Sequence, residues 1–149
     1  PSVKNVSGTT YRETIQLKEE LYENKETRSL SPLIRAITMR SLGLIYNDYI
    51  HNQFQLPCVA GKRLVVISER GEVKPCEILD KSFGNLRDHN YDMSKILNKA
   101  ESRKTQNWIV SSKCHCTFEC AMNISVLYDW KGYPDLLRRA AKLFFQTNP

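Results

Sequence analysis

The sequence lacks any long apolar run. None of its stretches approaches the ~20 consecutive apolar residues that a helix needs to cross a bilayer. The first residues also lack the apolar core of a signal peptide. We therefore expect neither a membrane protein nor a newly exported precursor, and we expect the chain to be cytoplasmic. There is also no internal repeat and no low-complexity tract.

What is present is typical of a folded domain. The 149 residues fit one compact domain, and 41% hydrophobic with 26% charged residues exclude wholesale disorder. Lys and Arg outnumber Asp and Glu by 22 to 16, which gives a formal net charge of +6 and a pI near 9.1. This moderate basicity is compatible with an anionic partner but does not by itself indicate nucleic acid. We expect neither a membrane nor a nucleic acid as partner.

Cysteine is absent from residues 1–57, and its distribution afterwards is informative. The chain has five cysteines, so a full set of disulfides would leave one thiol over. Disulfides are rare in the cytosol, where clustered cysteines more often bind a metal. Three of the five cysteines fall within the short segment 114–120. Metal binding is therefore the leading interpretation from the residues alone.

Residues 1–56 are predicted to form a helical lead-in that carries no chemical motif. Apolar residues recur at helical spacing among charged ones over residues 10–26. A proline in the first turn predicts a second helix from Pro32 to about Phe54. We expect this lead-in either to pack on the domain that follows or to link that domain to the rest of a larger protein.

A β-hairpin is predicted next. A β-branched run at residues 64–67 and a second short strand at residues 72–74 flank a turn that contains Gly71. Cys58 precedes this hairpin and Cys76 follows it. Because a hairpin brings its two ends together, we expect both sulfurs to face one site.

The remaining segments are predicted from turn signals and helical periodicity. Residues 83–86 predict a tight turn, residues 91–103 a short helix, and the stretch after residue 132 a final helix. We expect three aromatic side chains to pack around the cysteine site: Trp108, Phe118 and Trp130.

These elements predict an α+β fold in two parts. Residues 1–56 form the helical lead-in. Residues 57–149 form a domain with a small β-hairpin and a cysteine-bound site, closed by C-terminal helices.

The spacing of the cysteines bears on which metal they bind. Thiolates bind zinc, copper(I) and iron-sulfur clusters. Structural zinc sites usually show two short-spaced cysteine pairs, whereas Cys58 and Cys76 are too far apart for one zinc knuckle. A 4Fe–4S cube spreads its four ligands over a wider shell than one zinc ion, which suits dispersed donors. The chemistry therefore favours a cluster over zinc by a modest margin.

The frame around the hairpin resembles a known family. Cys58, twelve further residues, Gly71, four further residues and Cys76 match a Cys-x9–15-Gly-x4-Cys pattern. That pattern opens the SPASM and twitch domains, the C-terminal auxiliary-cluster domains of radical S-adenosylmethionine enzymes. Residues 71–76 (Gly-Glu-Val-Lys-Pro-Cys) are similar to the family's hairpin, and residues 83–87 (Phe-Gly-Asn-Leu-Arg) to the turn that follows it.

The closing cysteines extend this resemblance to about residues 57–128. Cys114, Cys116 and Cys120 stand where the family has its closing cysteine cluster. The full SPASM pattern has seven cysteines and two auxiliary clusters, whereas this chain has five cysteines. The resemblance therefore implies one 4Fe–4S cluster, as in the shorter twitch version.

The same resemblance implies a ligand set. Cys58, Cys76 and Cys120 carry over most directly as cluster ligands, and the fourth ligand is either Cys114 or Cys116. In the family, such clusters are proposed to pass electrons to or from the substrate or to help to seat it.

A radical S-adenosylmethionine enzyme also needs a Cys-x3-Cys-x2-Cys loop, which this sequence lacks. The pair Cys116-x3-Cys120 has no third member, because the next position of the pattern is Asn123. No barrel half and no glycine-rich cofactor loop is recognisable. We therefore expect a non-catalytic C-terminal part of a larger enzyme, with S-adenosylmethionine bound only in the barrel domain. The expected partners are that barrel domain and a peptide or protein substrate, and we assign no catalytic residue.

Two alternatives stay open. A structural zinc module that mediates protein or nucleic-acid interactions predicts a colourless, redox-silent protein, although zinc would also replace iron in protein prepared in air. Reduced thiols in a helical interaction domain predict that serine at Cys58 or Cys120 leaves folding nearly unchanged. His115 lies between two cysteines, and we expect it to point away from them, because neighbouring side chains usually point apart.

Overall fold

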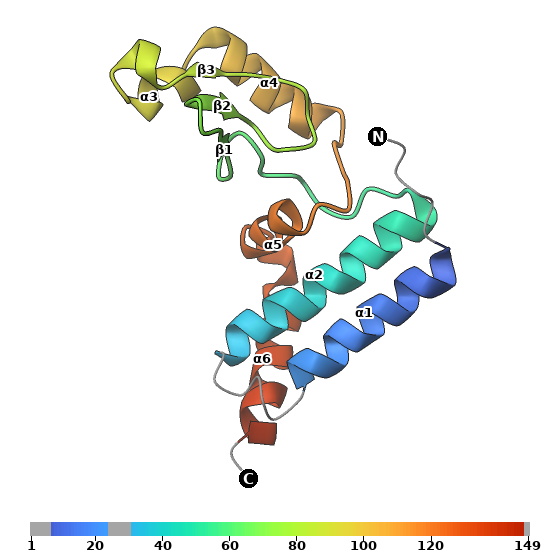
Figure 1. Cartoon of the computed structure of the whole chain (residues 1–149). Helices are drawn as coiled ribbons and strands as arrows, with labels where there is room; N and C mark the ends of the chain where they lie inside the picture. Colours follow the sequence, from blue (N-terminus) through green and yellow to red (C-terminus); the bar gives the residue numbers. More distant parts are fainter. Residues whose placement is uncertain (1–6, 24–30, 148–149) are drawn as a thin grey trace.

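The chain folds into a mostly helical structure with one small sheet (Figure 1). This computed structural model describes residues 7–23 and 31–147. The α+β fold class predicted from the sequence is confirmed. In chain order the elements are α1 (Gly8–Glu23), α2 (Pro32–His51), β1 (Val66–Ile67), β2 (Glu72–Lys74), β3 (Gly84–Asn85), the 3₁₀ turn η2 (Arg87–His89), α3 (Met93–Leu97), α4 (Ala100–Ser111), α5 (Glu119–Leu127), the 3₁₀ turn η3 (Trp130–Gly132) and α6 (Tyr133–Thr147).

Helices α1, α2, α5 and α6 form one part of the molecule, which we call the helical layer. Helix α2 packs against the other three, and Figure 1 shows α1 running alongside it. The apolar side chains of α2 are divided between two cores. Ile45 packs with Val126 of α5, whereas Ala36 packs with Leu136 of α6. The layer is thus held together by apolar burial on both sides of α2.

The two lead-in helices predicted from the sequence are confirmed, with shifted ends. The predicted extension of the first helix to residue 26 lies outside the described residues. Helix α2 ends at His51 rather than near Phe54, because Asn52 adopts a left-handed conformation with φ 45° and its N–H bonds to the carbonyl of Asp48.

The second part is the sheet region, residues 58–113, which contains β1 to β3, α3 and α4. Strand β2 pairs antiparallel with β1 on one side and with β3 on the other. The predicted hairpin is confirmed, and Gly71 supplies the positive φ of 83° that its turn requires. Val73 of β2 is fully buried and packs with Phe83 and Ile96 in the core of this region.

The predicted tight turn at residues 83–86 is wrong, because residues 84–85 form strand β3. The N–H of Phe83 donates to the carbonyl of Val73 at 2.7 Å, and the N–H of Leu86 donates to the carbonyl of Gly71 at 2.9 Å. A glycine followed by asparagine is frequent in turns. Here the edge of β2 offers these residues their hydrogen-bond partners, so they extend the sheet.

The predicted helix over residues 91–103 is divided into α3 and α4, and α4 continues to Ser111. Gln106 of α4 donates to the carbonyl of Leu97 at 3.2 Å and to that of Gly61 at 3.0 Å. One buried amide therefore joins the end of α3, the middle of α4 and the loop that follows the first cysteine.

The lead-in and the C-terminal helices pack together. Helix α2 lies against α5 and α6, which follow the cysteine segment in the sequence. Arg40 of α2 donates to the carboxylate of Asp129 at 2.5 Å, and both side chains are mostly shielded from water. The lead-in therefore packs on the domain that follows it, while the boundary at residue 57 stays a prediction. No helix in the described stretches is both long and apolar enough to span a membrane.

Candidate functional site

The hairpin brings Cys58 and Cys76 into one buried cluster. Both cysteines pack with Ala60 and Ile109, as expected for residues at the two ends of a hairpin. Cys76 is 5% exposed, and its sulfur accepts a hydrogen bond from the N–H of Leu79 at 3.4 Å. The loop after β2 thus fixes one of the two thiols.

Cys114 joins this cluster from the end of α4. Its N–H donates to the carbonyl of Ile109 at 3.0 Å, and the preceding Lys113 adopts a left-handed φ of 53°. This turn ends the helix and brings Cys114 into the cluster of Cys58 and Cys76. Three thiols from three separate segments of the sequence therefore meet in one place.

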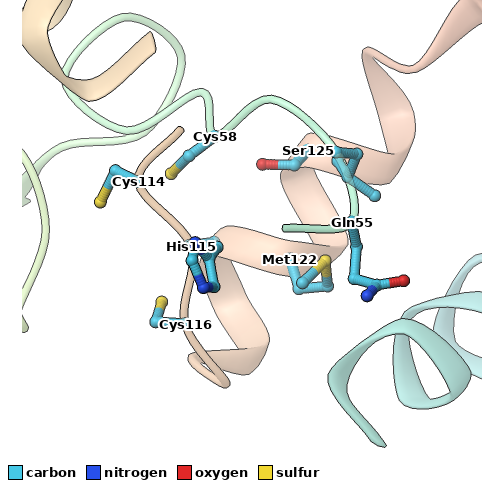
Figure 2. A pocket seen from close by; sticks show the side chains of 9 residues that line it. Gln55, Cys58, Cys114, His115, Cys116, Met122 and Ser125 are labelled. Carbon is cyan, nitrogen blue, oxygen red and sulfur yellow. The ribbon is translucent and has the colours of Figure 1, made fainter. Parts of the chain in front are cut away.

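A small cavity of about 20 Å³ lies beside these thiols. Figure 2 shows Cys58 and Cys114 close together, and the sulfur of Cys116 is turned toward the same side. The cavity has room for about one water molecule. Its lining residues are Gln55, Leu56, Cys58, Cys114, His115, Cys116, Ala121, Met122 and Ser125.

Burial raises the pKa of three thiols in this group. For Cys58, desolvation is the largest cause, and hydrogen bonds from the backbone of Ala60 and from Ser125 offset it in part. For Cys114, desolvation followed by the nearby Cys58 and Cys116 raises the pKa to about 11. Desolvation also raises the pKa of Cys116. At neutral pH these groups are protonated thiols, and a bound cation would shift them to thiolates.

Cys120 stands apart from the other four cysteines. It is exposed in the first turn of α5 and does not line the cavity. None of the five cysteines forms a disulfide. Across residues 7–23 and 31–147, no three His, Cys, Asp or Glu side chains are arranged to hold a metal ion. The ligand set that the resemblance implies therefore stays a prediction.

His115 is fixed by two contacts of its own. Its Nδ1 lies 2.8 Å from the carbonyl of Lys113, and its Nε2 lies 3.8 Å from Oδ1 of Asp48. Asp48 is 4% exposed, and its Oδ2 has no hydrogen-bond partner among the described residues. Burial raises the pKa of Asp48, and His115 opposes this rise in part. Helix α2 thus supplies a buried acid to the loop that carries the cysteines.

Sequence reasoning missed both Asp48 and Ser125. Asp48 lies three positions after Ile45, on a helix face that is buried. A carboxylate at such a position is costly, and this is the signal that would have found it. Ser125 accepts a hydrogen bond from the N–H of Val59 at 3.3 Å, which fastens α5 to the chain beside Cys58. A serine within an apolar helix carries no distinctive signal.

Two of the three aromatic side chains expected around the cysteine site do not pack there. Trp108 is 47% exposed and Trp130 is 71% exposed. On α4 the neighbouring Ile109 takes the position against the cysteines. Phe118 is half-buried, and its backbone forms a hydrogen bond with Cys116.

Comparison with known proteins identifies a family match for the segment that contains the cysteines. Residues 58–121 match the family model of SPASM, an iron-sulfur cluster-binding domain. The matched segment begins at Cys58, contains all five cysteines and includes the whole sheet region. No curated protein and no solved structure matches the chain.

Proposed function

We propose that this chain is the auxiliary-cluster part of a radical S-adenosylmethionine enzyme, because residues 58–121 match the family model of the SPASM iron-sulfur cluster-binding domain. In this proposal it holds one 4Fe–4S cluster and supports electron transfer or the positioning of a peptide substrate. S-adenosylmethionine binds in a separate barrel domain, so the chain has no radical activity by itself. The observation that carries the proposal is the family match. Within the matched segment Cys58, Cys76 and Cys114 pack in one cluster, and Cys116 lines the cavity beside it.

The donors fit a cluster in chemical type, since iron-sulfur clusters are held by cysteine thiolates. We propose Cys58, Cys76 and Cys120 as ligands, with Cys114 or Cys116 as the fourth. Cys120 lies within the matched segment, a few residues after Cys114 and Cys116, which supports its role. The segment 114–120 must shift for Cys120 to join the others, so this part of the site would rearrange on loading.

The surrounding residues hold and shield the thiols. Ala60, Ile109 and Leu79 form an apolar shell around them, which limits access of water. The N–H of Leu79 donates to the sulfur of Cys76, and such bonds stabilise negative charge on a thiolate. When bound, an iron-sulfur cluster supplies one-electron redox chemistry. The shell and this hydrogen bond are the means by which the chain would tune it.

A structural zinc module is the second candidate function. Four cysteine thiolates are a common zinc ligand set. The cavity lined by Cys58, Cys114 and Cys116 has a volume of only about 20 Å³, so a single ion would require less movement of these thiols than a cluster. In that case the chain would mediate protein or nucleic-acid interactions and would be redox-silent.

We propose the cytoplasm as the location and the barrel domain of the same enzyme as the main partner. Five unpaired cysteines are typical of a reducing compartment.

The first test is metal and sulfide content after purification and reconstitution without oxygen. We expect about four iron and four sulfide ions per chain, with broad visible absorption that bleaches on reduction. One zinc ion per chain and no sulfide, even after anaerobic reconstitution, would exclude the cluster and favour the zinc module.

Serine substitutions then separate the ligands. We expect Cys58→Ser, Cys76→Ser and Cys120→Ser each to abolish most of the bound iron. Of Cys114→Ser and Cys116→Ser, one should lose iron and the other should match the unsubstituted chain as the control. The contrary outcome is that Cys120→Ser keeps its iron while Cys114→Ser and Cys116→Ser both lose it. In that case Cys58, Cys76, Cys114 and Cys116 are the ligands, and our assignment of Cys120 is wrong.

A further inference from the structure

A larger cleft, which we call the aromatic cleft, lies next to Cys58. Its volume of about 310 Å³ falls within the size range of ligand sites. Leu56 and Ser125 line both this cleft and the thiol cavity, so the two share a wall. The other lining residues include Pro57, Val59, Tyr128, Trp130 and Lys131.

Two aromatic rings line the aromatic cleft, and both are exposed. Tyr128 is 52% exposed and Trp130 is 71% exposed. A cation lies over each ring, since Arg63 is 5.0 Å from the centre of the Tyr128 ring and Lys131 is 5.7 Å from that of Trp130. Exposed rings beside cations suit a ligand that carries both an apolar side chain and a negative charge.

The charge that the aromatic cleft offers to a ligand is positive. Asp129 is the one acid among its lining residues, and its carboxylate is already paired with Arg40. Neither Arg63 nor Lys131 forms an ion pair within the described part of the chain. Both cations are exposed and therefore accessible to a ligand.

The turn that carries the two rings is organised before any ligand binds. The N–H of Asp129 donates to the carbonyl of Val126 at 3.2 Å, and the N–H of Gly132 donates to the carbonyl of Asp129 at 2.9 Å. The guanidinium of Arg40 lies so close to Gly132 that a Cβ there would overlap it. A preorganised site loses less conformational entropy on binding.

We propose that the aromatic cleft binds an acidic peptide segment. An aromatic or aliphatic side chain of the peptide packs against Trp130 and Tyr128, and its carboxylates lie beside Arg63 and Lys131. The inference rests on the proposed function in one respect: the bound peptide is the substrate, seated beside the cysteine site. The binding itself does not depend on a cluster.

The test measures fluorescence anisotropy of a labelled Glu-Glu-Phe-Glu-Glu peptide on anaerobically reconstituted protein, with iron content determined in parallel. We expect this peptide to bind more tightly than Lys-Lys-Phe-Lys-Lys or Glu-Glu-Ser-Glu-Glu. Trp130→Ala should weaken binding about three- to tenfold. Lys131→Glu should weaken it about threefold, and less at high salt.

Matched controls carry the same substitutions outside the aromatic cleft. Trp108→Ala and Lys104→Glu change exposed residues that line a different hollow beside α4, and they should leave the affinity unchanged. Equal binding of the acidic and basic peptides, or equal losses in Trp108→Ala and Trp130→Ala, would overturn the inference. So would displacement of the peptide by a thymidine oligonucleotide that binds more tightly.

The parallel iron measurement separates the two proposals. Fully loaded protein that fails to bind Glu-Glu-Phe-Glu-Glu would refute the acidic-peptide cleft and leave the cluster function standing. Protein that never takes up iron but binds the peptide through Trp130 would refute the cluster function and support the cleft.

Discussion

The helical layer and the sheet region are stabilised in different ways. The helical layer consists mainly of long helices around two apolar clusters, and it also buries polar side chains such as Arg35 and Asp48 of α2. The sheet region has strands of two or three residues, and one of its two cores contains thiols. Strands so short are marginal on their own. The helical layer can therefore be stable without a bound metal, whereas the sheet region gains stability from whatever its cysteines bind.

Matched core substitutions test this comparison most strongly. Ile45 lies in the helical layer and Ile96 in the sheet region, and both are buried. Ile45→Ala and Ile96→Ala should each lower the free energy of unfolding by about 2–5 kcal/mol, because each leaves a cavity. Anaerobic iron loading should restore stability mainly in Ile96→Ala. Denaturant titrations followed by circular dichroism, with and without iron, measure this, and equal restoration in both variants would contradict it.

Substitutions at two glycines test whether the contact between Gly132 and Arg40 stabilises the helical layer. Gly132→Ala should lower the free energy of unfolding by about 1–3 kcal/mol, because its Cβ would displace the guanidinium of Arg40 and disturb the ion pair with Asp129. Gly43→Ala is the control, since a Cβ at Gly43 in α2 meets nothing within 4 Å. It should raise stability by about 0.5–1 kcal/mol. Thermal unfolding of both variants checks the pair, and similar losses in the two would argue against the contact at Arg40.

Asp48 of the helical layer contacts His115 in the segment that follows the sheet region, and its ionisation should show in the pH dependence of stability. Burial raises its pKa above the ordinary value of 3.8, so the folded state binds this proton more tightly than the unfolded chain. The contribution of Asp48 to the stability of the metal-free protein is therefore lost as the pH rises from about 3.8 through its raised pKa. Asp48→Asn removes that loss and should raise the free energy of unfolding at pH 7 by about 1 kcal/mol.

Asp80→Asn, at an exposed position in the sheet region, is the control for Asp48→Asn and should change little. Denaturant titrations from pH 4 to pH 7 compare the two variants. Lower stability of Asp48→Asn at pH 7 would mean that the charged carboxylate stabilises the fold through His115.

The smallest effect is expected at Asp135, in the first turn of α6. Arg139, and next Arg138, hold the pKa of Asp135 below its usual value through hydrogen bonds and charge. The carboxylate therefore stabilises the fold above its ordinary pKa, and this contribution is lost as the pH falls through its lowered pKa. Asp135→Asn should cost less than about 0.5 kcal/mol at pH 7, because the ion pairs are partly exposed to solvent. Thermal unfolding at pH 7 and pH 2, with and without iron, should show that iron does not alter this difference.

How far the sequence predicts the molecule depends on the range of the interactions involved. Helix α2 and the hairpin around Gly71 were predictable, because spacing and turn chemistry are local signals. Strand β3 was not, since its residues extend only because β2 lies beside them. Helix α5 was missed for a similar reason, as it is apolar on most sides and shows little helical contrast.

The candidate site also combines contacts that local sequence patterns predict with contacts that they do not. That Cys58 and Cys76 would meet follows from the hairpin between them. The contact of Asp48 with His115 joins residues far apart in the chain, and no local pattern encodes it. The exposure of Cys120 likewise depends on how α5 sits against the helical layer.

The position at which the family match ends determines which residues would have to be moved to graft this domain into another protein. The match stops at residue 121, inside helix α5, which continues to Leu127. Val126 is fully buried and lies beyond that point. A graft cut at the end of the match would sever the helix and leave its remaining turn without a partner on α2. The transferable unit is therefore larger than the recognised domain, and a host would have to provide its own equivalent of α2.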